Sequence, residues 1–347
     1  MKSLLLDGLL NGIDFKLLEP FRNKTVVVTG ATGLIGSLVC KALLLANKSK
    51  SLNVNIIAVV RNKSKATSIF ADYSPLNFIL LDLYTAKVSD IIITADYILH
   101  AASITTSKLM IERPVDVLQT SINGTGIMLQ LALRTHARMV YVSSMEFYGS
   151  LDVDVVADEN ALGYINLSSP RSCYPESKRF CECLCNSYAA QYGVHVCSAR
   201  LAQTFGAGVL PGENRAFAQF ARNAMKGTDI VLRTQGLSEG NYVNSVDCVA
   251  GLLLLLAGGQ AGHAYNIANE ESHRTIREVA QMATDLLGKG KSKVVVELDH
   301  GNSCGYAPDV HLRLSSAKIR KLGWSPKFSL SESFVHLGQY FREQSML

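Results

Sequence analysis

Tyr174 and Lys178 are the two residues whose types and spacing point most directly to catalysis. They stand four residues apart in CYPESKRFCECL, so they share one face if the segment is helical. An ammonium group close to a phenol favours the phenolate and lowers the phenol pKa from its usual value of about 10. The pair therefore predicts a tyrosine that accepts and returns a proton near neutral pH. The alternative is that both residues simply decorate the surface.

A second candidate is the stretch SSMEFYG, residues 143–149, which follows the apolar run MVYV. It is either a packed strand end or one wall of an active site. Glu146 is a candidate base, or else it forms an ion pair with a nearby cation such as Arg171. Its neighbour Met145 cannot transfer a proton. Chemistry that needs two adjacent carboxyl groups is therefore disfavoured, while chemistry with one base remains open.

Three glycines, Gly30, Gly33 and Gly36, lie between the apolar run KTVVVTG and the helical pattern GSLVCKALLLANK. In a dinucleotide-binding turn the first glycine permits the tight turn and the second lets the pyrophosphate approach the backbone. The third lets the helix pack closely on the strand, and the helix N-terminus faces the phosphates. Because a second apolar run follows at 55–61, we interpret the glycines as a dinucleotide site and not as an unliganded turn.

The ends of the following strands bear on which dinucleotide binds. Enzymes that use NAD usually carry an acid at the end of the second strand, whereas this chain has Arg61. A guanidinium group can form two charge-assisted bonds to a 2′-phosphate, which favours NADP over NAD, although an arginine can also stack on adenine. We interpret Lys63 and Lys65 as solvated loop residues. Asp82 would accept a hydrogen bond from the adenine amino group, and His100 fits a packed or capping role better than that of a base.

The elements that must hold these residues alternate along the chain. Apolar strand runs are expected at 24–30, 55–61, 77–83, 96–102, 138–144 and 194–201, with helical stretches between most of them. This alternation predicts an α/β fold with a doubly wound parallel (Rossmann) sheet covered by helices on both faces.

We expect three parts along the chain. Residues 1–24 would form a lead-in and residues 25–205 a dinucleotide-binding domain that also carries the catalytic residues. Residues 206–347 would form a smaller α/β substrate-binding lobe, from which some segments return to the large sheet.

Composition narrows the class of protein. The 347 residues are 48% apolar and 18% charged, which suits a sizeable core, and the net charge of +5 gives little support to nucleic-acid binding. The longest apolar runs are too short for a membrane span, and the N-terminus does not read as a signal peptide. We therefore expect a cytoplasmic protein whose eight cysteines stay reduced. Among them, Cys181, Cys183 and Cys185 fit helix packing better than a metal site.

Several segments together resemble a known family. TGATGLIGS, HAAS, SSMEFYG, YPESK and RLAQTFG are similar to the extended short-chain dehydrogenase/reductase superfamily, and within it to the nucleotide-sugar epimerase/dehydratase branch. The resemblance spans roughly residues 24–326 and includes KLGWSP near the C-terminus. The segment GYINLSSPRSCYPESKR most resembles UDP-glucuronate decarboxylases.

The resemblance implies a mechanism. Tyr174 would remove the proton from a sugar C4 hydroxyl while hydride passes to the nicotinamide, and Lys178 would hold the nicotinamide ribose. Ser144 would hydrogen-bond the same sugar oxygen, and Glu146 would act after C4 is oxidised. Dehydration, decarboxylation and epimerisation all remain open for that second stage.

The resemblance also implies the remaining site residues. Those expected to bind the cofactor are Gly30, Thr32, Gly33, Leu34, Ile35, Gly36, Arg61, Asp82, Leu83, Ala101, Ala102, Ser103, Tyr174 and Lys178. Those expected to bind the substrate are Ser103, Ser144, Met145, Arg171, Gln203, Arg215, Arg233 and Arg313. The last three are alternatives, because the chain has Gly240 where relatives carry a phosphate-binding arginine. Asp247 fits a family acid whose role is largely structural.

The leading hypothesis is therefore an NAD(P)-dependent enzyme that acts on a nucleotide sugar, with no nucleic-acid or membrane partner. One alternative is a net reductase of a 4-keto sugar or another small carbonyl compound, and another is a dinucleotide-sensing protein without catalysis. The apolar helical segment 123–135 and the helix after Tyr174 would pair across a two-fold axis as a four-helix bundle. We thus expect a homodimer.

Overall fold

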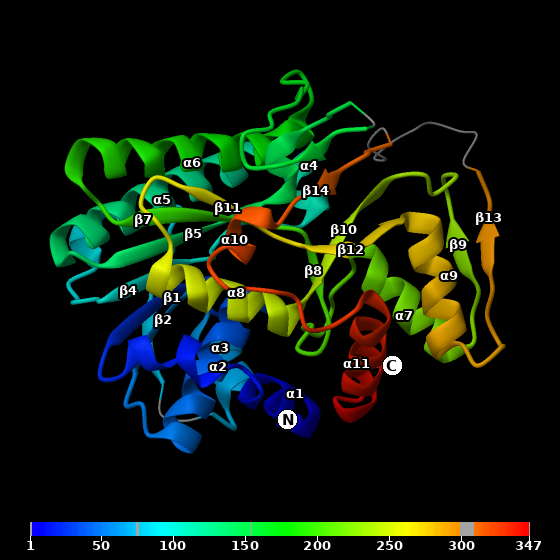
Figure 1. The fold of residues 1–347 in the computed structure, drawn as a ribbon, viewed down its shortest axis with the longest axis horizontal. Helices are drawn as coiled ribbons and strands as arrows, with labels where there is room; N and C mark the ends of the chain where they lie inside the picture. The colour runs from blue at the N-terminus through cyan, green and yellow to red at the C-terminus, as the bar shows by residue number, and fades with distance from the viewer. Residues whose placement is uncertain (1, 74–75, 153, 299–308, 347) are drawn as a thin grey trace.

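The computed structural model describes residues 2–73, 76–152, 154–298 and 309–346 (Figure 1). Seven strands form one sheet in the order β11-β7-β5-β4-β1-β2-β3, and every pair in it is parallel. They are β1 (Thr25–Thr29), β2 (Asn55–Val60), β3 (Asn77–Leu80), β4 (Tyr97–His100), β5 (Arg138–Ser144), β7 (Val196–Leu201) and β11 (Ala264–Ile267). The predicted doubly wound parallel sheet is confirmed.

Helices cover both faces of this sheet. Figure 1 shows α5 and α6 on one face and α2, α3 and α8 on the other. Strand β1 explains the arrangement, since Val26 and Val28 pack into the core shared with α2 and α8, whereas Val27 packs into the core shared with α5. Successive side chains point to opposite faces, so a run of valines is buried on both. The bounds are α2 (Leu34–Lys50), α3 (Lys63–Phe70), α4 (Ser107–Glu112), α5 (Pro114–Thr135), α6 (Cys173–Tyr192) and α8 (Ser245–Gly258).

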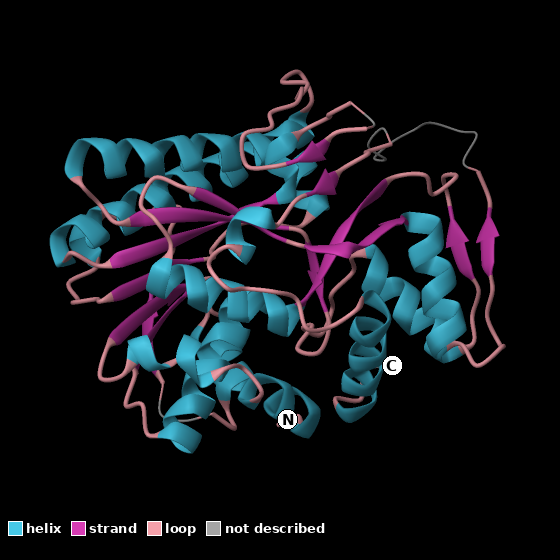
Figure 2. Cartoon of the chain, in the orientation of Figure 1, coloured by secondary structure: helices cyan, strands magenta, loops and turns pink. Residues whose placement is uncertain are grey.

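A smaller lobe lies beside the large sheet (Figure 2). Its three-stranded sheet has the order β12-β10-β8, and two further pairs join β13 to β9 and β14 to β6. The strands are β6 (Val156–Ala157), β8 (Gln203–Phe205), β9 (Ile230–Leu232), β10 (Glu239–Asn244), β12 (Asn269–Thr275), β13 (Val294–Val296) and β14 (Arg313–Leu314). The helices are α7 (Ala216–Lys226), α9 (Ile276–Leu287), α10 (Ala317–Arg320) and α11 (Leu330–Glu343). Helix α8 and strand β11 follow residue 205 in the sequence but pack with the large sheet. The two parts of the structure are therefore not separated by a single boundary at residue 205.

The N-terminal lead-in joins the two parts. Helix α1 (Leu4–Asn11) packs against α2 of the large domain and against α11 of the smaller lobe. The buried Asp7 accepts a hydrogen bond from the Tyr73 hydroxyl, and Ser3 donates to Glu343. In the described part of the chain, no helix is both long and apolar enough to cross a membrane.

The strand order places the site. The sequence of strands reverses between β1 and β4, and in open parallel sheets ligands bind in the crevice beyond the carboxyl ends at such a point. Two short 3₁₀ helices border this crevice, η4 (Met145–Tyr148) directly after β5 and η5 (Pro170–Ser172) directly before α6.

Candidate active site

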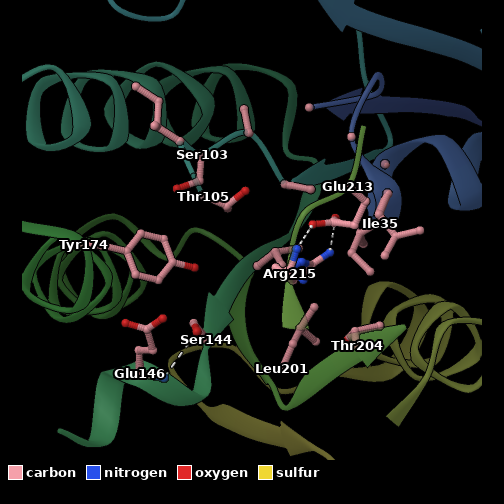
Figure 3. A pocket seen from close by; sticks show the side chains of 18 of the residues that line it. Ile35, Ser103, Thr105, Ser144, Glu146, Tyr174, Leu201, Thr204, Glu213 and Arg215 are labelled. Atoms are coloured by element: carbon pink, nitrogen blue, oxygen red, sulfur yellow. Dashed lines mark hydrogen bonds and ion pairs between the residues drawn. The ribbon is translucent and has the colours of Figure 1, made fainter. Parts of the chain in front are cut away.

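A cavity of about 600 Å³ lies at the carboxyl ends of the parallel strands. Its walls come from the glycine turn after β1, the loop after β4, the turn after β5, helix α6 and the segment from β8 to α7. Figure 3 shows Tyr174, Ser144 and Glu146 at one end and Ile35 at the other, with Glu213 and Arg215 between. The cavity thus brings together both groups of residues that the sequence marks for chemistry.

The glycine turn fits only residues without a Cβ atom. Gly30 has a φ of +65°, and a Cβ there would lie 2.7 Å from the Ala101 carbonyl oxygen. A Cβ on Gly36 would lie 2.4 Å from the Gly30 carbonyl oxygen. Helix α2 begins after Gly33, which offers no side-chain cap to the first N–H groups of the helix. These groups are available to a phosphate, so the cradle fits a dinucleotide. Of the predicted cofactor residues, Gly30, Thr32, Gly33, Leu34, Ile35, Gly36, Leu83, Ala101, Ala102 and Ser103 line the cavity.

His100 helps to hold the ends of β1 and β4 together. The Thr29 hydroxyl accepts a hydrogen bond from the Ala102 backbone N–H at 3.1 Å and bonds His100 Nδ1 at 2.7 Å. Burial, followed by the charge of Lys178, lowers the pKa of His100 to about 3. His100 is therefore a neutral, packed histidine and not a base at physiological pH.

At the far end of the cavity, Arg61 and Lys65 both line the wall. Lys65 lies in the first turn of α3, where its backbone N–H donates to the Asn62 side chain at 2.9 Å. The interpretation of Lys63 and Lys65 as loop residues is wrong, because Asn62 caps a helix there. Asp82 is exposed and accepts from the Tyr84 backbone N–H at 3.1 Å, while its neighbours Leu81 and Leu83 line the cavity.

Tyr174 and Lys178 are both buried on α6 and both line the cavity. The Lys178 Nζ atom lies 5.5 Å from the centre of the Tyr174 ring and donates to the Val142 carbonyl oxygen at 2.9 Å. Burial lowers the pKa of Lys178 to about 8. Burial, together with the charge of Glu146, raises the pKa of Tyr174 to about 12, against hydrogen bonding from Ser144 and the charge of Arg171.

The expectation that the pKa of Tyr174 lies below its usual value is therefore wrong. Loss of hydration around the phenol outweighs the positive charges nearby. A positive charge added to the cavity by an oxidised dinucleotide would oppose this effect.

Glu146 lies on η4, opposite Tyr174 in the cavity (Figure 3). The Ser144 hydroxyl accepts from the Glu146 backbone N–H at 3.2 Å. Arg171 Nη2 donates to the two Glu146 carboxylate oxygens at 3.0 and 2.8 Å. Both side chains are about one-third exposed. The predicted ion pair with Arg171 is therefore present, and the carboxylate also lines the cavity, where its role as a base stays a prediction.

Met145 and Gly240 lie against each other. Met145 is buried and lines the cavity, and a Cβ on Gly240 would lie 3.1 Å from the Met145 Cε atom. The two departures from the family pattern are therefore one packing unit, in which the methionine fills space that a side chain on β10 would take.

The substrate side contains Gln203, Arg215, Phe217 and Phe220, all of which line the cavity. Arg215 Nη2 pairs with Glu213 at 2.7 Å, and the Arg215 guanidinium lies 5.0 Å from the centre of the Phe217 ring. Glu213 was missed by the sequence analysis, although a carboxylate two residues before an arginine in a loop was the available signal.

The other two candidate arginines lie elsewhere. Arg233 pairs with Glu297 at 2.8 Å on the surface, and Arg313 on β14 is exposed. Of the three candidates, Arg215 alone is among the described residues that line the cavity.

A family model described as the NAD dependent epimerase/dehydratase family matches residues 26–268. The chain belongs to this family. The resemblance inferred from the sequence motifs is thereby confirmed.

Proteins named for a specific activity match more than nine-tenths of this chain. UDP-glucuronic acid decarboxylase 1 of Xenopus tropicalis is 27% identical over 329 residues, which is 95% of this chain and 75% of that protein. UDP-glucuronic acid decarboxylase 6 of Arabidopsis thaliana is 28% identical over 321 residues, or 92% of this chain and 89% of that protein.

Solved structures of the family superpose over most of the fold. An epimerase from Methanothermobacter thermautotrophicus gives a TM-score of 0.80 at 22% identity and covers 95% of both chains. The dTDP-glucose 4,6-dehydratase DesIV of Streptomyces venezuelae, solved with NAD and TYD bound, gives 0.75 at 26% identity and covers 92% of this chain and 97% of its own.

Proposed function

We propose that this protein converts a nucleotide-linked sugar by transient oxidation at C4, and that decarboxylation of a hexuronic acid is the reaction most consistent with the site. The observation that carries the proposal is the single cavity in which Tyr174, Ser144 and Glu146 converge beside the glycine cradle. The decarboxylase relatives that match nearly the whole chain support the same reaction class.

When bound, NAD(P)⁺ would supply a hydride acceptor and a positive charge to the site. Tyr174 would take the proton of the C4 hydroxyl as hydride leaves C4, and Ser144 would hydrogen-bond the same oxygen. Lys178, fixed on the same face of α6, would bind the nicotinamide ribose. After the second stage the hydride returns to C4 and Tyr174 gives its proton back, so the cofactor is unchanged overall.

The second stage belongs to Glu146 and Arg171. A ketone at C4 stabilises negative charge at C5, so a C5 carboxylate can leave as CO₂ and C5 then takes up one proton. Arg171 would offer a cation to such a carboxylate, and its partner Glu146 would donate the proton to C5. The same carboxylate would serve as the C5 base in an epimerisation or a dehydration. Dehydration is the least favoured of the three, because Met145 cannot protonate a leaving hydroxyl.

We propose NADP as the preferred dinucleotide, with Arg61 as the group that binds the 2′-phosphate. Arg61 follows β2 and lines the cavity with Lys65, so two cations face this end of the site. A phosphate between two cations forms charge-assisted hydrogen bonds that a ribose hydroxyl does not.

We further propose a cytoplasmic homodimer that forms through α5 and α6. These helices pack against each other, and their outer surfaces carry the exposed side chains Leu133, Phe180 and Tyr192. Cys181 and Cys185 are buried beneath them, whereas Cys183 is exposed. Light scattering of the purified protein at several concentrations tests the assembly, and a monomer throughout would contradict it.

The decisive experiment is a panel of nucleotide sugars incubated with the protein and NAD(P)⁺, without added reductant, and followed by NMR. We expect conversion of a nucleotide hexuronic acid to a nucleotide pentose, with release of CO₂. Conversion only when NAD(P)H is consumed would indicate a net reductase instead. No change with any sugar, in a protein that still binds dinucleotide, would favour a sensing role.

Tyr174→Phe tests the mechanism within the same assay. Removing the phenol should reduce turnover by about a hundredfold or more, because general acid–base catalysis contributes about 10²–10⁴. Tyr164→Phe is the matched control, since Tyr164 is exposed and lies outside the cavity lining. Unchanged turnover in Tyr174→Phe would show that the proposed chemistry is wrong.

A further inference from the structure

Arg200 is a buried arginine on β7 that has no place in the proposed chemistry. Only 4% of its surface is exposed, and it does not line the cavity. It forms a buried ion pair with Glu182 of α6, in which Nε lies 3.1 Å from both carboxylate oxygens and Nη2 lies 2.9 Å from Oε2. Burying two charges is costly, so a pair with this many bonds calls for a purpose beyond filling the core.

Most of the remaining contacts of Arg200 lead toward the turn that carries Glu146, while its Nη1 also donates to the Glu159 carbonyl oxygen at 2.9 Å. The guanidinium lies 3.5 Å from the centre of the Phe147 ring and 5.0 Å from the centre of the Tyr148 ring. Its Nη1 donates to the Tyr148 hydroxyl at 3.0 Å, and that hydroxyl donates to Asn266 at 2.8 Å. The two residues directly after Glu146 are therefore fixed by a single guanidinium group.

A second arginine holds the backbone of the same turn. Arg179 donates to the carbonyl oxygens of Phe147 at 2.8 Å and of Tyr148 at 3.1 Å. Arg179 and Glu182 both lie on α6, the helix that carries Tyr174 and Lys178. The turn at 145–148 is thus fastened to the same helix that presents the hydride-transfer residues.

Glu146 itself has little else to fix it. Its side chain is about one-third exposed and pairs with Arg171 on η5. Its backbone N–H donates to the Ser144 hydroxyl, and its carbonyl oxygen accepts from the Gly149 backbone N–H at 3.2 Å. The direction in which its carboxylate points therefore depends on the backbone of η4, and this backbone depends on Phe147 and Tyr148.

We propose that Arg200 is a positioning residue that fixes η4 on α6 and so sets the distance between Glu146 and the reacting sugar. The inference rests on the proposed function for its kinetic consequence. Arg200 would not affect removal of hydride from C4, which needs Tyr174, Lys178 and Ser144. It would affect the second stage, because misplacement of a reacting group by about 1 Å can cost about a hundredfold in rate.

Arg200→Lys is the first test variant. A lysine keeps a positive charge for Glu182 but has no planar face for Phe147 and no fork to reach Tyr148 and Glu182 together. Phe147→Leu is the second, because it leaves Arg200 and Glu182 intact and removes only the aromatic face. The matched control is Arg138→Lys, since Arg138 lies at the opposite end of β5 and donates to the Leu256 and Gly259 carbonyl oxygens at 2.9 Å.

Two readouts on the protein with NADP⁺ decide the proposal. Hydrogen exchange should accelerate at least tenfold in 143–149 in Arg200→Lys, with less change in 174–192, and should stay as in the wild type in the control. In single turnovers, the absorbance of reduced cofactor should rise at the wild-type rate and then persist, while product forms about 10- to 100-fold more slowly. Phe147→Leu should show the same pattern at a smaller amplitude.

Unchanged exchange at 143–149 would overturn the proposal, and so would equal slowing of cofactor reduction and product formation. If the wild type converts no nucleotide sugar, the proposed function fails on that ground, and the exchange measurement still decides whether Arg200 positions the turn.

Discussion

The dinucleotide end of the cavity is shaped by backbone, whereas the end around Glu146 is shaped by side chains from separate segments. At the first, a Cβ atom on Gly30 would clash with the Ala101 backbone, and one on Gly36 would clash with the Gly30 backbone. At the second, Glu146 is held by Arg171, and between the two ends Arg215 is held by Glu213. The glycine cradle thus depends on close backbone contacts, whereas the end around Glu146 depends on side-chain contacts that a few substitutions can change.

The largest expected effect that separates the two ends comes from adding one methyl group to each. Gly36→Ala should weaken dinucleotide binding by about a hundredfold, since overpacking against rigid backbone costs about 1–3 kcal/mol and each 1.4 kcal/mol is tenfold. Gly240→Ala should leave that affinity unchanged, because the nearest atom is the flexible end of Met145. Titration calorimetry measures both, and equal losses would mean that the ends do not differ in this way.

A somewhat smaller effect is expected on cofactor preference when the Arg61 side chain, which lines the dinucleotide end, is replaced. Arg61→Ser should lower the preference for NADP over NAD by about 10- to 100-fold, because hydrogen bonds to a charged group contribute about 1.5–3 kcal/mol. Lys63→Ser removes a cation two residues away that does not line the cavity, so it is the matched control. An unchanged ratio of dissociation constants in Arg61→Ser would leave the arginine without a role in cofactor choice.

The strands and the glycine turn were predictable from the sequence because their pattern lies in short runs of consecutive residues. Each depends on neighbouring residues, and the runs at 55–61 and 138–144 became β2 and β5 with at most one residue of difference. The sequence predicted that some segments after residue 205 return to the large sheet, but nothing in HAYNIA identified β11 as the strand beside β7, because strand pairing is decided by contacts distant in sequence.

The substrate side was less predictable for a related reason. Three arginines, Arg215, Arg233 and Arg313, were equal candidates for one phosphate clamp, and spacing cannot distinguish among them. The fold separates them, since Glu213 orients Arg215 at the cavity while Glu297 holds Arg233 at the surface.

Arg215→Met tests whether Arg215, and not Arg233, binds the substrate. Loss of the guanidinium should raise the KM for the nucleotide sugar by about tenfold, because a charge-assisted bond to phosphate is lost while the ion pair with Glu213 already competes for it. Affinity for the dinucleotide should not change. Arg233→Met is the control, and a larger rise in KM there than in Arg215→Met would reverse the assignment.

The smallest expected effect is on the pH dependence of the free energy of unfolding, at the contact between α8 and the C-terminal segment. Asp247 on α8 is buried and accepts from the Phe328 backbone N–H at 3.0 Å, which attaches the C-terminal segment to the helix. Burial raises its pKa to about 6, above the value of about 3.9 in an unfolded chain. Between these values the folded protein binds more protons than the unfolded chain, so this group's contribution to the free energy of unfolding is fully present below about pH 4 and is lost as the pH rises through 6.

Asp247→Asn removes this dependence, because the amide still accepts from Phe328 and does not titrate. The stability of the variant relative to the wild type should therefore rise by up to about 2 kcal/mol between pH 4 and pH 7, as measured by urea unfolding across that range. Asp152→Asn, at an exposed aspartate, should show no such trend. A constant difference between Asp247→Asn and the wild type would mean that the charged carboxylate is accommodated at this junction without cost. In that case the hydrogen bonds at this junction would offset the cost of burying the charge.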